Sequence, residues 1–237
     1  MNGFDGTNKS PPDGEEVNYA LNSIVTLEPR SKSLPNYPLL NYRNSLVVMN
    51  DGNVLSLGGR VTKNCYILTE KSWKYHSTPA KFRNCGVTVT MPNGVYVFGG
   101  FNSYDYTYKK EDCLSSEFLP NGSQIWQNGP DVPDFWISYS NTFHNFFPSW
   151  HKGITSEHAH KISEQELIIV RGDHILRYNI KTQIWDIFCH LGFYGHDTSS
   201  IVFGGKLYRT GGRKHMGWSL PYTEVVDLKT RVSSKIF

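Results

Sequence analysis

Short runs of β-branched, aromatic and other apolar residues recur along this chain, and turn-forming residues bound each of them. Four runs end in or beside a glycine, in the segments 53–59, 94–100, 166–172 and 206–212. Apolar runs of this length between turn signals are typical of buried strands. A double glycine ends three of the four, and Arg171-Gly172 ends the other. The pattern therefore predicts four buried strands, each followed by a break.

A second strand is expected directly before each run. These strands span residues 45–49, 86–91, 158–162 and 199–203. Between strand and run lie the turn candidates Asp51-Gly52, Asn93-Gly94, residues 163–165 and Gly204-Gly205. Asp-Gly and Asn-Gly are strong hairpin turns because glycine accepts a positive φ, whereas residues 163–165 contain no glycine. Each unit is thus predicted to open with a hairpin.

A second hairpin follows the glycine positions, and its last strand begins near a tryptophan. Tyr66 precedes Trp73 by seven residues, and Tyr178 precedes Trp185 by the same step. The second unit supplies Trp126, and the fourth has Ser233 at the tryptophan position. Units of four strands over roughly 40–50 residues are typical of the blades of a β-propeller.

At these positions the sequence resembles kelch repeats, which carry an apolar run, a double glycine, a later tyrosine and a closing tryptophan. The resemblance covers residues 42–233. It implies an all-β, kelch-type β-propeller with about four recognisable four-stranded blades. It leaves open whether the blades form a compact small ring, a fragment of a longer propeller, or a ring completed by another chain. A WD40 propeller is disfavoured because the only Trp-Asp pair, Trp185-Asp186, precedes the only Gly-His pair.

The remainder of the chain gives the expected domain boundaries. Residues 1–17 are polar and predict a disordered tail, residues 18–40 an outer strand of a partial blade, and residues 41–237 the propeller repeats. The start of the chain has no apolar signal-peptide core, and no stretch is long enough to span a bilayer. The four cysteines form no C-x-x-C pair, so we expect free thiols in a reducing compartment. Together these features predict a soluble, cytoplasmic protein.

The net charge of +3 comes without a strong basic cluster, so neither a nucleic acid nor a membrane is an expected partner. Strands of one blade alternate in direction, so the segments after the second and fourth strands emerge on the same face. Kelch propellers commonly bind partners there, as the resemblance implies. The irregular segments 101–117, 129–155 and 213–222 belong to this face and are rich in aromatic residues. Long loops on a rigid scaffold tend to carry function.

The predicted contact residues are aromatic, histidine and arginine side chains of these segments, because such groups are the usual anchors of interfaces. They are Arg60, Phe101, Tyr104, Tyr106, Tyr108, Trp136, Phe146, Trp150, His151, Arg213, His215 and Trp218.

The sequence therefore favours a non-enzymatic protein-binding module, with a protein or peptide as partner. Open sheet edges would also favour self-association. The alternative is a kelch-fold enzyme that acts on a sugar or another small molecule through His144, His151 and His158. His158 and His160 share one face of a predicted strand, but no carboxylate or cysteine with diagnostic spacing supports a metal there. No metal and no cofactor is expected.

Overall fold

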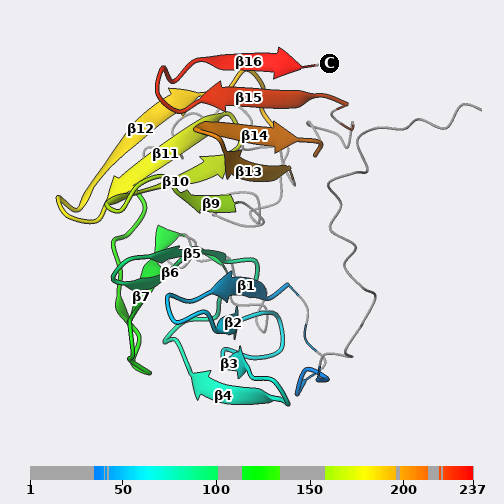
Figure 1. The fold of residues 1–237 in the computed structure, drawn as a ribbon, viewed down its shortest axis with the longest axis vertical. Coiled ribbons are helices and arrows are strands. Elements are labelled where there is room, and N and C mark those ends of the chain that lie inside the picture. The colour runs from blue at the N-terminus through cyan, green and yellow to red at the C-terminus, as the bar shows by residue number, and fades with distance from the viewer. Residues whose placement is uncertain are drawn as a thin grey trace, which may run out of the picture. The chain divides into compact units, whose positions relative to one another are not determined.

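The computed structural model describes residues 35–39, 41, 43–100, 114–133, 158–195, 198–212, 219 and 221–236. All of them belong to one compact unit, Pro35–Phe237. The predicted strands of the four units are confirmed in the described part of the chain, with bounds that shift by one or two residues. The expected tail, residues 1–17, and most of the expected outer strand, residues 18–40, lie outside the described residues, and residues 35–39 belong to no strand. They form four antiparallel sheets of four strands each (Figure 1).

Each sheet is one blade, numbered in chain order. Blade 1 contains β1 (Ser45–Val48), β2 (Val54–Leu57), β3 (Cys65–Leu68) and β4 (Trp73–Ser77). Blade 2 contains β5 (Val87–Met91), β6 (Gly94–Phe98), β7 (Ser116–Pro120) and β8 (Gln127–Asn128). Blade 3 contains β9 (His158–Lys161), β10 (Glu166–Arg171), β11 (His174–Asn179) and β12 (Ile184–His190). Blade 4 contains β13 (Ser199–Phe203), β14 (Lys206–Thr210), β15 (Thr223–Asp227) and β16 (Ser233–Ile236).

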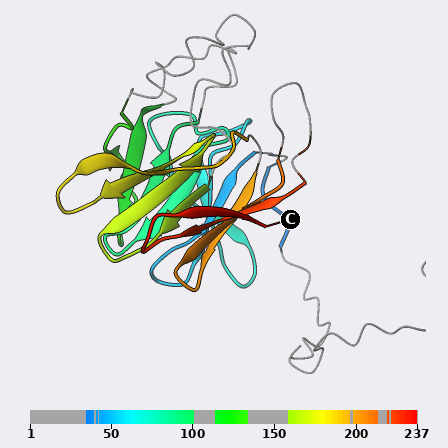
Figure 2. The ribbon, with the colours of Figure 1, turned by 90° about the horizontal axis from the view of Figure 1, so that it is seen from above.

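The strands of each blade pair in simple chain order, so each blade is an antiparallel meander. The first strands of successive blades pack on one another, β1 on β5, β5 on β9 and β9 on β13. Four-stranded meanders that pack face to face through their first strands form a β-propeller fold. Figure 2 shows the same blades from above, in the colours of Figure 1.

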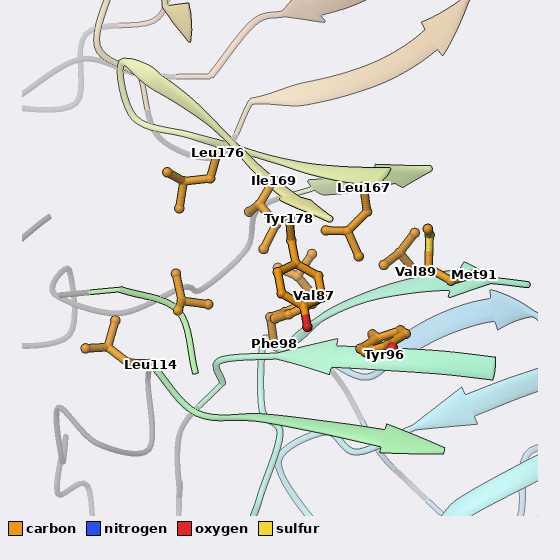
Figure 3. Close-up of a cluster of buried hydrophobic side chains, with 11 residues drawn as sticks. Val87, Val89, Met91, Tyr96, Phe98, Leu114, Leu167, Ile169, Leu176 and Tyr178 are labelled. Atoms are coloured by element: carbon orange, nitrogen blue, oxygen red, sulfur yellow. The ribbon is translucent and has the colours of Figure 1, made fainter. Parts of the chain in front are cut away.

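The hydrophobic core lies between the blades. Successive residues of a strand point to opposite faces, so the two faces of each blade contribute to different clusters. In β6, Val95 and Val97 pack toward blade 1, whereas Tyr96 and Phe98 pack toward blade 3. Figure 3 shows the second of these clusters, where Phe98 and its neighbours meet side chains of blade 3. A third cluster joins blades 3 and 4.

The tryptophans fill space between neighbouring blades. The Trp126 indole belongs to the cluster between blades 1 and 2, and its Nε1 donates to Ser77 Oγ of blade 1 over 3.0 Å. Trp185 meets Phe98 of blade 2 edge to face, with 5.5 Å between ring centroids. Each side chain therefore packs its blade against the preceding one.

Trp73 occupies the same position in blade 1, where it contacts residues 35–37. Its Nε1 donates to the carbonyl oxygen of Pro35 over 3.2 Å. The Tyr37 ring lies 5.1 Å from the Trp73 ring and 5.5 Å from that of Tyr66, both edge to face. Ser56 Oγ donates to Tyr37 Oη. Residues 35–37 thus cover part of the outward face of blade 1.

The double glycines allow a close approach of backbone, as their sequence context indicated. A Cβ on Gly58 would lie 2.9 Å from the carbonyl oxygen of Arg83. A Cβ on Gly100 would lie 2.8 Å from the Cα of Arg83. Both glycines also have positive φ, +65° and +84°. The backbone of Arg83 therefore lies against a glycine of blade 1 and a glycine of blade 2.

No helix in the described part of the chain is long and apolar enough to cross a bilayer.

A pair of substitutions separates close approach from backbone strain. Gly211 has φ +64° and nothing within 4 Å of the Cβ position, whereas Gly100 faces backbone. We expect Gly211→Ala to cost about 1–2 kcal/mol of unfolding free energy, the price of a left-handed alanine. Gly100→Ala should cost about 1–3 kcal/mol more because the added methyl also meets Arg83. Urea denaturation of both variants measures this, and equal losses would contradict the close-approach argument.

Candidate binding site

The segments that follow the second and fourth strand of each blade lie on one side of the sheets, because the four strands alternate in direction. We call this side the connection face. The tight turns after the first and third strands lie on the opposite side, which we call the turn face. The sequence placed all candidate contact residues on the connection face.

A cavity of about 820 Å³ lies on the connection face at blade 2. This volume is within the range of roughly 300–1,000 Å³ that is usual for ligand sites. Three segments line it: the linker from blade 1, the start of β7, and the segment after β8. The lining residues are Ala80, Lys81, Arg83, Leu114, Ser115, Ser116, Glu117, Asn128, Gly129, Asp131, Val132 and Pro133.

Arg83 is fully buried and holds two of these segments together. Its Nη1 donates to the carbonyl oxygens of Gly99, at 2.7 Å, and Ser115, at 2.9 Å. These two residues stand on either side of the connection that contains residues 101–113. The amide of Gly99 also donates to Ser115 O over 2.9 Å. Hydrogen bonds therefore hold together Gly99 and Ser115, the residues between which this connection runs in the sequence.

Glu117 of β7 is the counter-charge of Arg83 and is equally buried. Its Oε2 accepts from Arg83 Nε, at 2.9 Å, and from Nη2, at 2.7 Å. The amides of Ala80 and Lys81 donate to the same carboxylate, over 2.6 and 3.3 Å. Glu117 thus joins the linker from blade 1 to the third strand of blade 2.

The segment after β8 is fixed to the same strand. The amide of Gly129 donates to Ser116 O over 3.0 Å, and that of Val132 donates to Leu114 O over 2.8 Å. Ser116 Oγ donates to Pro130 O over 2.8 Å. The cavity is consequently framed by backbone held in place by hydrogen bonds, with the Arg83–Glu117 pair at its base.

Blade 4 repeats this arrangement with an arginine from a different strand. Glu224 is the second residue of β15, as Glu117 is of β7, and its Oε1 accepts from the Gly192 amide over 2.5 Å. The buried Arg209 of β14 donates to the carbonyl oxygens of Gly172, Phe193 and Gly195. Arg209 Nη1 and Glu224 Oε2 are 3.7 Å apart, a looser contact than in blade 2. The same pair of charges thus fixes connection segments at two blades.

Sequence reasoning did not identify these arginine–glutamate pairs. The sequence offered one hint of them: a glutamate, Glu117 or Glu224, is the second residue of the third strand in blades 2 and 4. Residues 101–113 obscure the strand alignment of blade 2, and Arg83 and Arg209 come from unrelated sequence positions. Only the fold brings them to equivalent places.

Among the predicted contact residues, Arg60 is described, and it lies half-buried directly after Gly59 on the connection face. The others lie outside the described residues: Phe101, Tyr104, Tyr106, Tyr108, Trp136, Phe146, Trp150, His151, Arg213, His215 and Trp218. Two of their segments adjoin the cavity in sequence, because Leu114 follows residues 101–113 and Pro133 precedes residues 134–157.

His158 and His160 share one face of β9, as predicted, with ring centroids 6.2 Å apart. They point toward blade 4, where His158 Nε2 donates to Thr198 O over 3.0 Å and His160 Nε2 shares a hydrogen bond with Ser200 Oγ at 2.8 Å. Burial lowers the pKa of both rings, that of His160 to about 4, helped by the neighbouring His158. Both rings therefore serve the contact between blades 3 and 4.

A second histidine pair lies on the connection face of blade 3. The His174 and His190 rings are 4.6 Å apart, and His174 Nδ1 contacts Asp173 Oδ1. Within the described residues, no three histidine, cysteine or acidic side chains group closely enough to hold a metal ion. Cys65, Cys85 and Cys189 are free thiols, and burial raises the pKa of Cys65 to about 12 and that of Cys189 to about 11.

Removal of the Glu117 charge should strongly destabilise the protein. Glu117→Gln keeps the shape but removes the carboxylate charge that pairs with the buried Arg83 guanidinium, and breaking such a buried pair costs about 3–5 kcal/mol. The matched control is Glu164→Gln, because Glu164 forms an exposed pair with Lys161 whose loss costs at most about 1 kcal/mol. Denaturant unfolding measures both, and a Glu117→Gln variant as stable as the control would contradict the structural role of the pair.

Acid should weaken the contact between blades 3 and 4. The folded pKa of His160 is below the unfolded value of roughly 6.5, so the unfolded chain binds more protons between about pH 6.5 and pH 4. Stability therefore falls as the pH falls through this window. His160→Asn should remove about 3 kcal/mol of that loss at pH 4. Denaturant unfolding at pH 7 and pH 4 measures it, and an identical loss in wild type and variant would contradict the assignment.

Comparison with known proteins gives the fold and no family. No protein-family model matches the chain, and no curated protein matches it. Among the solved structures that it resembles is that of YjhT, with a TM-score of 0.67 and 12% sequence identity. The match covers 86% of this chain and 67% of that one. At this identity the likeness shows the fold alone, and together with the four meanders it establishes a β-propeller.

Proposed function

We propose that this chain is a non-enzymatic binding module that takes a segment of a protein partner in the cavity on the connection face. The observation that carries the proposal is the cavity itself, whose frame is rigid while its lining is chemically mixed. Leu114, Val132 and Pro133 offer apolar surface, whereas Lys81 and Asp131 offer charges of both signs. Such a lining suits a peptide, which presents side chains and backbone amides together.

The hydrogen bonding of the buried Arg83 and Glu117 side chains favours ligand binding over catalysis at this cavity. Arg83 and Glu117 hydrogen-bond each other and backbone groups of the surrounding segments, and Arg83 also donates to Ser115 Oγ. A guanidinium and a carboxylate used in this way fix the scaffold and are not positioned to exchange protons with a ligand. The pair therefore supports a binding surface of defined shape.

The proposal includes the predicted anchors of the adjoining segments. Tyr104, Tyr106 and Tyr108 come shortly before Leu114 in the chain, and Trp136 comes shortly after Pro133. Contact of these aromatic side chains with the partner is part of the proposal and follows from their sequence position beside the lining. We also propose that the four blades are kelch repeats, on the strength of their glycine, tyrosine and tryptophan pattern.

The alternative is a kelch-fold enzyme that acts on a sugar or another small molecule. The observation that favours it is the group of Asp173, His174 and His190 on the connection face of blade 3. A histidine beside a carboxylate is a candidate general base. His158, an earlier candidate for this role, is instead engaged with blade 4.

A peptide selection tests the binding proposal. A phage library of random 12-residue peptides, each longer than the three or four extended residues that roughly span such a cavity, is panned on the purified chain, and the selected peptides are measured by fluorescence anisotropy. We expect Asp131→Lys to weaken binding at least about tenfold, equivalent to about 1.4 kcal/mol. The matched control is Glu70→Lys, an exposed acidic residue on the turn face, which should bind as wild type does.

Two outcomes decide against the proposal. One is the absence of any enriched peptide, and the other is equal affinity of wild type and Asp131→Lys. A thermal-melting screen with monosaccharides addresses the alternative: a rise in Tm that His190→Gln abolishes would favour the enzyme.

A further inference from the structure

The cavity on the connection face of blade 2 lies across the start of β7, and neighbouring residues of this strand point to opposite sides. The Glu117 carboxylate accepts from the amides of Ala80 and Lys81, so it faces the linker from blade 1. The Ser116 hydroxyl donates to the carbonyl oxygen of Pro130, so it faces the segment after β8. These two segments therefore form opposite walls of the cavity, which we call the linker wall and the β8 wall.

The hydrophobic clusters place each wall beside a different neighbouring blade. Leu119 stands two residues after Glu117, on the same face of β7, and packs in the cluster between blades 1 and 2. Val132 comes from the β8 wall and packs in the cluster between blades 2 and 3. The linker wall thus lies on the blade 1 side of β7, and the β8 wall lies on the blade 3 side.

The two walls carry charges of opposite sign. Arg83 and Glu117 are buried and pair with each other at 2.7 Å, so their charges offset one another. The other charged residues that line the cavity in the described part of the chain are Lys81 and Asp131. Lys81 belongs to the linker wall and is half-buried, whereas Asp131 belongs to the β8 wall and is exposed. A ligand in the cavity therefore meets a cation on one side and a carboxylate on the other.

A second cation strengthens this difference between the walls. Lys63 Nζ donates to the carbonyl oxygen of Ala80 over 3.0 Å, which places its ammonium group beside the linker wall. The described lining of the β8 wall contains no basic residue; it consists of Asn128, Gly129, Asp131, Val132 and Pro133. The electrostatic potential thus changes from positive at the linker wall to negative at the β8 wall. Bound partners usually present the complementary charges, which fix their register.

We propose that the partner segment carries an acidic and a basic side chain two or three positions apart, the acid beside Lys81 and the base beside Asp131. A cube of 820 Å³ has an edge of roughly 9 Å, which about three extended residues span. Complementary charges on both walls decide in which direction the segment crosses β7. The proposal deepens the proposed function and rests on it, because it names the chemistry of the segment that the cavity takes.

A charge-exchange experiment with peptides from the 12-residue library tests this specificity. Peptides enriched on the wild-type chain are synthesised again with their acidic and basic residues exchanged, and both forms are titrated by fluorescence anisotropy. We expect the exchange to weaken binding to the wild type at least about tenfold, because two attractive pairs become two repulsive ones. The double variant Lys81→Asp/Asp131→Lys should show the reverse preference and bind the exchanged peptides more tightly.

The double variant contains its own control for total charge, because it only exchanges one lysine and one aspartate between the walls. Neither side chain is buried, so the variant should fold, and its far-ultraviolet circular dichroism and Tm check this. The matched control is Lys161→Glu/Glu164→Lys, which exchanges an exposed ion pair on the turn face. This control should keep the peptide preference of the wild type.

The other outcomes overturn the proposed specificity and separate it from the proposed function. Enriched peptides that bind the wild type equally well in both forms show that the cavity takes a segment without regard to the order of its charges. A preference that the double variant does not reverse places the recognised charges elsewhere. If no peptide is enriched on the wild type, the proposed function fails, and the specificity fails with it.

Discussion

The buried pair of Arg83 and Glu117 is the interaction on which the connection face depends. Two charges out of water cost several kcal/mol each, and this cost is offset only where the hydrogen bonds are complete. Here the carboxylate also accepts backbone amides of the linker from blade 1, and the guanidinium also donates to carbonyl oxygens on both sides of the blade 2 connection. The backbone of Arg83 also lies close to Gly58 and Gly100, where the Cβ of any other residue would collide with it. One residue thus ties together three segments that are distant in the sequence.

Blades 2 and 3 pack on their neighbours in the same way, and blades 1 and 4 differ from them. Each inner blade buries both faces, and Trp126 and Trp185 fill the gap toward the preceding blade. Blade 1 has no preceding sheet in the described structure, and Pro35 and Tyr37 meet Trp73 instead. Blade 4 has Ser233 in place of the tryptophan and uses the Arg209–Glu224 pair toward blade 3, while its other face exposes Ile201 and Phe203. Both end faces leave large apolar side chains in contact with water, Leu46, Val48 and Tyr75 on blade 1 and Ile201, Phe203 and Ile236 on blade 4.

A sheet scaffold with variable connections is a common basis for recognition, because the scaffold fixes the position of the loops. The alternative histidine site of blade 3 lies on the same connection face, so either activity would use this side of the molecule.

The sequence by itself determined the strands, their grouping into four meanders and the face on which the connections emerge. These features are local: alternation of apolar residues, Asp-Gly and Asn-Gly turns, and a fixed step from tyrosine to tryptophan act over a few residues each. It also placed His158 and His160 on one face of a strand. The lack of a carboxylate or cysteine with diagnostic spacing argued against a metal there, but the hydrogen bonds to Thr198 and Ser200 depend on the neighbouring blade and could not be predicted. The cavity and the two arginine–glutamate pairs were decided only by the tertiary structure, because each depends on which residues from separate blades meet.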